Sequence, residues 1–138
     1  MRRSVVIVQA RLGSSRLPGK VLAKLAGRSV LSHVLERCAA IDGAEDVCCA
    51  IPVGSADDEV AREAARCGAR VVRGSEADVL DRYYRAAIEC RAEAIMRVTS
   101  DCPAIDPKIA GDVLQLAATN VADYACNNMP RSWPHGLD

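Results

Sequence analysis

A short basic segment contains the residues best suited to chemistry. Residues 9–20 read QARLGSSRLPGK, follow an apolar run directly, and contain no acid. The charged side chains of the segment are Arg11, Arg16 and Lys20. Gly13 and Ser14 are small enough to let backbone N–H groups approach phosphate oxygens, whose charge the cations would neutralise. The segment therefore favours a local anion site over a solvated basic turn, although its spacing matches neither a P-loop nor a dinucleotide fingerprint.

A carboxylate that follows another apolar run, Asp101, is the candidate metal ligand. Magnesium prefers carboxylate oxygens and takes phosphates and waters as its other ligands. An aspartate before a proline is also a frequent helix cap, so we assign the metal to Asp101 and the cap to Asp106. The neighbouring Cys102 has no histidine near it in the sequence, and we expect no covalent catalysis from it.

These residues must be positioned by alternating strands and helices. The predicted strands are 5–9, 46–51, 70–72 and 95–98, with a weaker one at 124–126. The predicted helices are approximately 30–40, 57–67, 79–91 and 107–118. This order predicts an α/β fold of Rossmann-like type, a mostly parallel sheet with helices on both faces. Ligands in such sheets collect at the carboxyl ends of the strands, where the basic segment and Asp101 lie.

Several helix boundaries have local signals. Ser55 or Asp57 is placed to cap the second helix, and Gly68 to end it. Pro107 suits a first helical turn after Asp106. His33 lies in an amphipathic stretch and is expected to pack, whereas His135, in a loop rich in proline and glycine, is a candidate for substrate contact.

Composition sets the limits of the protein class. The 138 residues suit one domain, 1–138, and the 18 basic residues balance the 18 acidic ones. We therefore expect no nucleic-acid or membrane partner, and no N-terminal signal or span is predicted, which favours the cytoplasm. The cysteine count is odd, at 7, and no CxxC spacing occurs, so reduced, mostly buried thiols are expected instead of disulfides or zinc.

The order Arg-x-x-Ser-x-Arg-Leu-Pro-x-Lys from Arg11 to Lys20 resembles the signature of cytidylyltransferases that activate 3-deoxy-manno-octulosonic and neuraminic acids. Residues 73–83, 97–106 and 133–138 look like the spore-coat polysaccharide branch of that family. The resemblance implies a fold of the nucleotide-diphospho-sugar transferase type. It also implies that CTP and Mg2+ are used to make a CMP-sugar and pyrophosphate.

The resemblance also implies roles for individual residues. The phosphates of CTP would be held by Arg11, Ser14, Arg16 and Lys20, with Lys20 near the α-phosphate, and Asp101 matches the family's magnesium-binding aspartate. We expect the base to be read by Gln9 and Ala10, by the loop at 52–55, and by Asp81 and Arg82. The alternative for Asp81 and Arg82 is a solvated helix face.

Members of the resembled family continue well beyond the Gly-Leu-Asp of residues 136–138, into a part that finishes the sugar pocket and often the contact of a homodimer. The chain is therefore expected to be truncated. Asp138, the only acid after Asp123, would serve poorly as a second metal ligand, so slow turnover is expected. Two alternatives stay open: a GT-A-type glycosyltransferase, for which the required Asp-x-Asp is lacking, and a relative that binds nucleotide without turnover.

Overall fold

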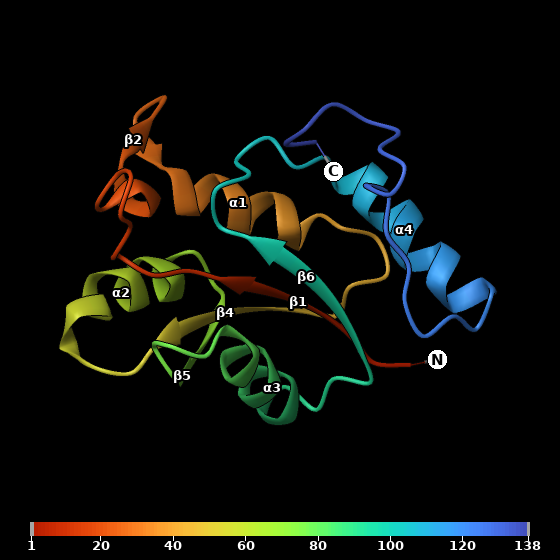
Figure 1. Cartoon of the computed structure of the whole chain (residues 1–138), viewed down its shortest axis with the longest axis horizontal. Coiled ribbons are helices and arrows are strands. Elements are labelled where there is room, and N and C mark those ends of the chain that lie inside the picture. Colours follow the sequence, from red (N-terminus) through yellow and green to blue (C-terminus); the bar gives the residue numbers. More distant parts are fainter. Residues whose placement is uncertain (1, 138) are drawn as a thin grey trace.

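A four-stranded parallel sheet forms the centre of the computed structural model, which describes residues 2–137 (Figure 1). Its strands are β1 (Ser4–Gln9), β4 (Asp46–Pro52), β5 (Arg70–Gly74) and β6 (Ala94–Thr99). Their order in the sheet is β5-β4-β1-β6, and every neighbouring pair is parallel. The short strands β2 (Lys24–Leu25) and β3 (Arg28–Ser29) form a separate antiparallel hairpin.

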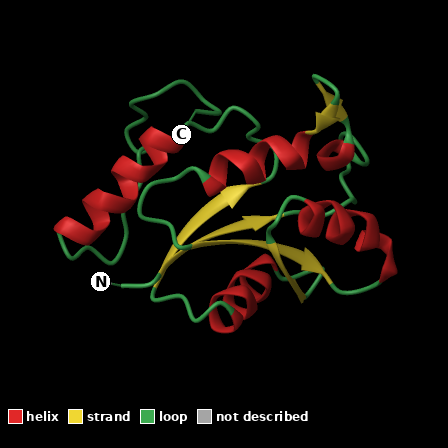
Figure 2. Cartoon of the chain, turned by 180° about the vertical axis from the view of Figure 1, so that it is seen from behind, coloured by secondary structure: helices red, strands yellow, loops and turns green. Residues whose placement is uncertain are grey.

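Helices cover both faces of the sheet. One face packs against α1 (Val30–Ala39), α2 (Asp58–Arg66) and the start of α4 (Pro107–Thr119), and the opposite face packs against α3 (Val79–Glu89), as Figure 2 shows from behind. β1 is buried on both faces: Val6 and Val8 belong to the first core, and Val5 and Ile7 to the second. Such a doubly covered strand is expected to be apolar throughout, as β1 is.

The predicted α/β fold is confirmed, and each of the four main strands and four helices lies within two residues of its predicted bounds. The strand predicted at 124–126 is wrong. These residues lie in the loop after α4, and the Tyr124 side chain is 78% exposed, so a strand here would lack the burial that stabilises one. The short 3-10 helices η1 (Lys20–Leu22) and η2 (Ser55–Asp57) were not predicted.

The β2–β3 hairpin was also missed, and its turn explains why. Leu25 pairs with Arg28, so the connection is the two residues Ala26 and Gly27, with φ of 49° and 81°. Two positive φ angles define a type I′ turn, whose usual first residue is asparagine, aspartate or glycine. Alanine at that position is strained and does not signal the turn in the sequence.

Helix capping follows the prediction at α4 and departs from it at α2. The Asp106 carboxylate accepts from the backbone N–H groups of Lys108 and Ile109, so its role as a cap is confirmed. Asp57 occupies the N-cap position of α2, but its side chain makes no capping hydrogen bond. Gly68 follows α2 with φ of 82°, the left-handed conformation expected after a helix end. Within residues 2–137, no helix is both long and apolar enough to cross a bilayer.

Candidate nucleotide site

The sheet has a switch point between β1 and β6. From β1 the chain moves outward to β4 and β5, then returns to place β6 on the other side of β1 (Figure 1). Gln9 and Thr99 are paired in register at the carboxyl ends of these two strands. Ligands in open α/β sheets bind in the crevice outside such a point. The loops that follow β1 and β6 flank this crevice.

The loop after β1 is held in shape by its own backbone and by one buried carboxylate. The Gly19 N–H donates to the Leu12 carbonyl at 3.0 Å, and the Ser14 hydroxyl accepts from the Leu17 N–H at 3.3 Å. Asp57 is 6% exposed, and its Oδ1 accepts from the Leu12 N–H at 2.6 Å. The side chain expected to cap α2 therefore fixes the loop instead.

Gly13 lies at the exposed part of this loop. A Cβ built on Gly13 would meet no atom within 4 Å, and its φ is not in the positive region that favours glycine. Neither packing nor backbone conformation in the free protein requires glycine here. The open space above it is where an approaching ligand could reach the backbone.

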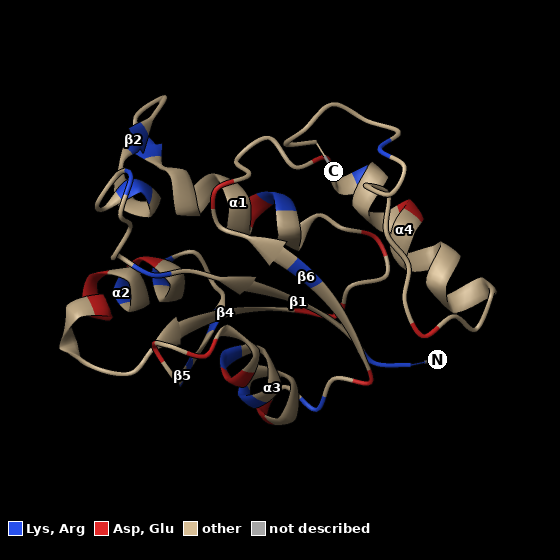
Figure 3. Ribbon diagram, viewed as in Figure 1, with Lys and Arg blue, Asp and Glu red and all other residues tan. Residues whose placement is uncertain are grey.

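Three cations lie on the chain segment that follows β1. Figure 3 shows basic residues along the chain between β1 and β2. Arg11 and Arg16 are exposed, and neither forms an ion pair with another residue of the described range 2–137. Lys20, at the start of η1, places its Nζ 3.3 Å from Asp101 Oδ2 in the loop after β6. Thus Lys20 and Asp101, predicted separately, meet at the switch point.

Asp101 is held in its ionised form. A hydrogen bond from Thr99, and then the interactions with Lys20, lower the pKa of the Asp101 carboxyl below its usual range. The carboxylate stays half-exposed, with 46% of its side chain accessible, so it can reach a ligand. No group of three or more histidine, cysteine or acidic side chains suited to a metal occurs among residues 2–137. A single carboxylate is the protein donor that Mg2+ would take when phosphates and waters supply its other ligands.

Gln9, at the end of β1, is held by Arg82 from α3. Arg82 lies in the first turn of α3, is 1% exposed, and donates from Nη2 to Gln9 Oε1 at 2.7 Å. The alternative of a solvated helix face is wrong for Arg82. Its burial also corrects the expectation that it touches the base directly, because its guanidinium lies beneath Gln9.

Two other residues expected to read the base are used differently. Ala10 is completely buried, and its N–H donates to the Ala50 carbonyl at 3.0 Å, so it extends the sheet by one residue. The Asp81 carboxylate accepts from the Ser75 N–H at 2.9 Å and from Arg85 Nε at 2.8 Å. Those hydrogen bonds lower the pKa of Asp81, the Ser75 bond most. Asp81 therefore shapes the loop before α3.

The loop at 52–55 is fastened by Arg73, at the end of β5. Arg73 Nη1 donates to the Gly54 carbonyl at 2.6 Å, and its Nη2 pairs with Asp58 Oδ1 at 2.6 Å. With Asp57 bound to Leu12 and Asp58 to Arg73, the one Asp-Asp pair of the sequence is occupied by structural contacts. That arrangement disfavours the glycosyltransferase alternative, in which paired acids bind a metal.

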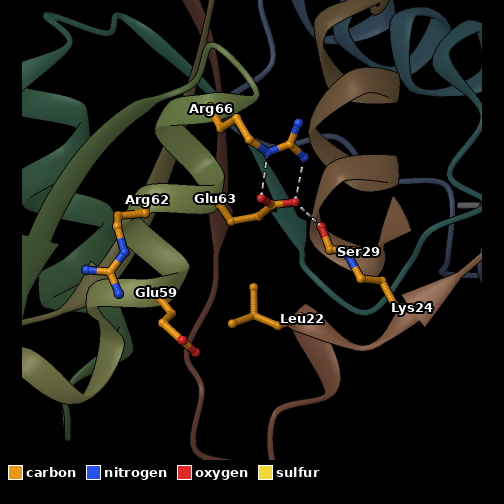
Figure 4. Close-up of a pocket in the computed structure, with 7 residues that line it drawn as sticks. All are labelled: Leu22, Lys24, Ser29, Glu59, Arg62, Glu63 and Arg66. Carbon is orange, nitrogen blue, oxygen red and sulfur yellow. Dashed lines mark hydrogen bonds and ion pairs between the residues drawn. The ribbon is translucent and has the colours of Figure 1, made fainter. Parts of the chain in front are cut away.

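A hollow of about 320 Å3 lies away from the crevice, between α2 and the β2–β3 hairpin (Figure 4). Glu63 lies at its wall and joins the two parts: it accepts from the Ser29 hydroxyl and forms two hydrogen bonds with Arg66, each at 2.8 Å. The bonds from Arg66, and then from Ser29, lower the pKa of Glu63 to about 2. The hollow is a structural junction that anchors the chain leaving the basic loop.

The cysteines behave as expected of reduced thiols, since all 7 are free. Burial is the main reason that the pKa of Cys38 rises to about 12, and that of Cys49 also to about 12. Cys102 lies beside Asp101, with 3.8 Å between Sγ and Oδ1. That neighbour is an acid that cannot activate a thiol as histidine does, so a nucleophilic role has no support.

One histidine packs as expected, and the predicted contact of the other, His135, with substrate stays a prediction. His33 Nε2 is 2.7 Å from the Leu25 carbonyl, so it packs against the β2–β3 hairpin, as expected. His135 is exposed, in a turn whose Leu137 carbonyl accepts from the Asp106 N–H at 3.4 Å. Asp138, considered as a late metal ligand, lies outside the described residues.

Three residues of the site were missed or misassigned from the sequence. Asp57 was assigned to capping, whereas Arg73 and Thr99 had no individual role. Asp57, Arg73 and Thr99 all lie at or just beyond carboxyl ends of predicted strands, and that placement was the available signal. Their partners come from distant parts of the chain, so spacing alone did not identify them.

Comparison with known proteins gives a consistent result. A family model described as cytidylyltransferase matches residues 5–131. The spore coat polysaccharide biosynthesis protein SpsF of Bacillus subtilis is 34% identical over 128 residues, which cover 90% of this chain and 53% of that protein.

Two solved structures are similar in fold. A cytidylyltransferase from Leptospira borgpetersenii superimposes with a TM-score of 0.83 at 34% identity, over 87% of this chain and 50% of that one. A CMP:2-keto-3-deoxy-manno-octonic acid synthetase complexed with CTP gives a TM-score of 0.78 at 26% identity, over 87% of this chain and 49% of that one. This chain therefore spans about half the length of the proteins it matches.

Proposed function

Because this chain belongs to the cytidylyltransferase family, we propose that it binds CTP at the crevice between β1 and β6 and transfers CMP to a sugar. The observation that carries the proposal is the contact of Lys20 with Asp101 at the switch point. Arg11 and Arg16, on the same chain segment, form no ion pair among residues 2–137. An anion with several charges would occupy all three cations. A triphosphate meets that requirement.

In the proposed reaction the oxygen of a sugar hydroxyl bonds to the α-phosphorus of CTP. The bond from that phosphorus to the bridging oxygen breaks, and pyrophosphate leaves with the electron pair while the hydroxyl proton passes to solvent. Little covalent chemistry falls to the protein, so the rate depends on position and charge. Arg11, Arg16 and Lys20 would hold the phosphates and stabilise the charge that develops on their oxygens.

Asp101 is the residue that would hold Mg2+, which when bound supplies further positive charge to the phosphate oxygens. In the free protein Lys20 already occupies this carboxylate. Phosphates that attract Lys20 would release Asp101 for the metal. Lys20 would thus bind the phosphates of CTP, and Asp101 would bind the metal.

The finer parts of the proposal concern substrate and setting. We infer a sugar acid as acceptor and a role in surface polysaccharide synthesis, supported by the names of the octulosonic acid synthetase and of SpsF. We also propose that a form of the protein as long as these relatives is a homodimer.

Nucleotide binding is tested by calorimetry with Lys20→Ala and Arg16→Ala. Each variant should weaken CTP binding by about tenfold in low salt, and by less in high salt, because salt screens exposed charges. Lys108→Ala is the control: this lysine is 83% exposed on α4 and pairs with Asp112, and its loss should leave the CTP affinity unchanged. Unchanged CTP affinity in both loop variants would contradict the proposal.

Turnover is tested separately by pyrophosphate release from CTP with a panel of sugar acids and neutral sugars. Release that depends on a sugar acid supports transfer. Tight CTP binding without release for any sugar would leave a nucleotide-binding relative, and would contradict the enzymatic part of the proposal. Hydrolysis or transfer from a finished nucleotide sugar would instead favour a glycosyltransferase.

A further inference from the structure

The amide of Gln9 has only one possible orientation. Arg82 Nη2 lies 2.7 Å from the amide atom assigned as Oε1. Arginine has donors and no acceptor, so the atom facing it must be the amide oxygen. The Nε2 group of Gln9 is therefore the free donor of this side chain. Gln9 is the last residue of β1 and lies at the switch point.

Arg82 is itself held firmly. Its Nη1 donates to the carbonyls of Ser75 and Glu76 at 2.8 and 2.9 Å. The end of β5 approaches closely, because a Cβ on Gly74 would lie 3.0 Å from the Cα of Arg82. Only glycine permits that approach without displacing α3. Gly74, the loop at 75–76 and Arg82 thus form a rigid support beneath Gln9.

This support is costly to the fold. Arg82 Nε is buried without a hydrogen-bond partner among the described residues, and no carboxylate lies within ion-pair distance of its guanidinium there. Desolvation, and then the charge of Arg11, lower the pKa of Arg82. A charge buried without a carboxylate partner costs desolvation free energy, which its hydrogen bonds only partly offset. A role in ligand binding would account for placing such a charge beside Gln9.

We propose that Arg82 is a positioning residue that fixes the Gln9 amide so that its N–H group faces N3 of the cytosine ring. N3 is an acceptor in cytosine, whereas uracil carries a proton there and would oppose one donor with another. A site built around such a hydrogen bond rejects an analogue that cannot make it. The inference rests on the proposed binding of CTP. It names the Gln9 side-chain N–H as the group that makes the site prefer CTP to UTP.

The decisive variant is Gln9→Glu, which keeps the size of the side chain and a partner for Arg82 but removes the N–H group. The ratio of CTP affinity to UTP affinity should fall about tenfold, the loss expected for one hydrogen bond. The added negative charge affects both nucleotides and cancels in the ratio. Gln115→Glu makes the same change at an exposed position of α4 and should leave the ratio unaltered.

Arg82→Met tests the positioning role. It should lower the CTP to UTP ratio as Gln9→Glu does, and the double variant should be no worse than either single one, because both remove the same hydrogen bond. Circular dichroism identifies a variant that fails to fold. If Arg82→Met fails to fold, the CTP to UTP ratio of Gln9→Glu alone tests the inference.

Inorganic tripolyphosphate separates this inference from the proposed function. If the unaltered protein binds CTP no better than tripolyphosphate, there is no base recognition and both proposals fail. If it prefers CTP to UTP and Gln9→Glu leaves that preference unchanged, only the role of Gln9 and Arg82 is overturned. A reduced ratio in Gln9→Glu, with Gln115→Glu unaffected, supports the inference.

Discussion

Lys20 and Asp101 are separated by 81 positions in the chain and by 3.3 Å in the structure. The pair is exposed, so its net contribution to stability is at most about 1 kcal/mol. Under the proposed function, Lys20 would bind the phosphates and Asp101 the metal. The ion pair between Lys20 and Asp101 would then compete with both ligands.

This competition predicts the behaviour of Asp101→Asn. The variant should lose the magnesium dependence of CTP binding, because amide oxygen is a weaker ligand than carboxylate. Without metal, its CTP affinity should equal or exceed that of the unaltered protein by up to about fivefold, since Lys20 is released. Calorimetry with and without Mg2+ measures both effects. Asp112→Asn, which breaks the exposed Lys108 pair on α4, is the control.

Persistent magnesium dependence in Asp101→Asn would show that the ion is held elsewhere. A fall in metal-free affinity would contradict the competition between Asp101 and the phosphates for Lys20.

At the scale of elements, the β2–β3 hairpin and α2 together hold the exit of the basic loop. Ser29 both caps α1, by accepting from the Ser32 N–H at 3.0 Å, and donates to Glu63 on α2. Ser29 thus links the β2–β3 hairpin to the start of α1 and to α2. Weakening this junction should loosen the loop that precedes it without touching the crevice directly.

Glu63→Gln should reduce the loss of stability in acid. The folded-state pKa of about 2 lies below the ordinary value of 4.5, so the ionised form stabilises the fold above about pH 5. That contribution disappears as the pH falls through about 2. Because solvent screens much of it, we expect about 1 kcal/mol. Urea unfolding from pH 6 to pH 2 should give a shallower decline for Glu63→Gln, and parallel curves would contradict the assignment.

Ala26→Asn should stabilise the protein by about 0.5 to 1 kcal/mol. Ala26 has φ of 49° in a type I′ turn, a conformation that asparagine adopts more easily. Ala40→Asn is the matched control, since that residue has φ of −93° after α1 and should gain nothing. Equal shifts of the urea midpoint in both variants would exclude relief of strain as the cause.

At the scale of the whole molecule, a net charge of zero coexists with a loop after β1 that carries three cations and no acid. Because the net charge is zero, any attraction for an anion must come from such a local cluster and not from the field of the whole protein. The binding of a triphosphate should then stabilise the whole fold, because β1 contributes to both cores and ends at the site.

CTP at about 100 times its dissociation constant should add about 2.7 kcal/mol and raise Tm by several degrees. UTP and ATP at equal concentration should raise it less. Thermal unfolding of the unaltered protein and of Lys20→Ala measures this directly, and the variant should show a smaller shift with every nucleotide. Equal shifts for the three nucleotides in the unaltered protein would contradict a preference for CTP.

The sequence by itself determined the elements and their order, and it predicted an anion site in the loop after β1. Apolar periodicity marked β1 and α1 to within two residues, and the spacing of Arg11, Arg16 and Lys20 indicated phosphate binding and the family. Such signals are local, since each depends on residues that are neighbours in the chain. They failed at 124–126, where an apolar run has no partner strand to bury it, and at Ala26, whose type does not signal its turn.

Only the tertiary structure decided which distant groups became partners. The Asp57 carboxylate accepts a hydrogen bond from the Leu12 N–H instead of capping α2. Arg82 is buried and donates to Gln9. Lys20 forms an ion pair with Asp101. The sequence alone was equally compatible with a capping role for Asp57 and with a solvated position for Arg82. It was also compatible with separate ligand contacts for Lys20 and Asp101. The order of the strands resolved these alternatives, because placing β6 beside β1 and packing α3 on the opposite face brings together side chains that no spacing rule connects.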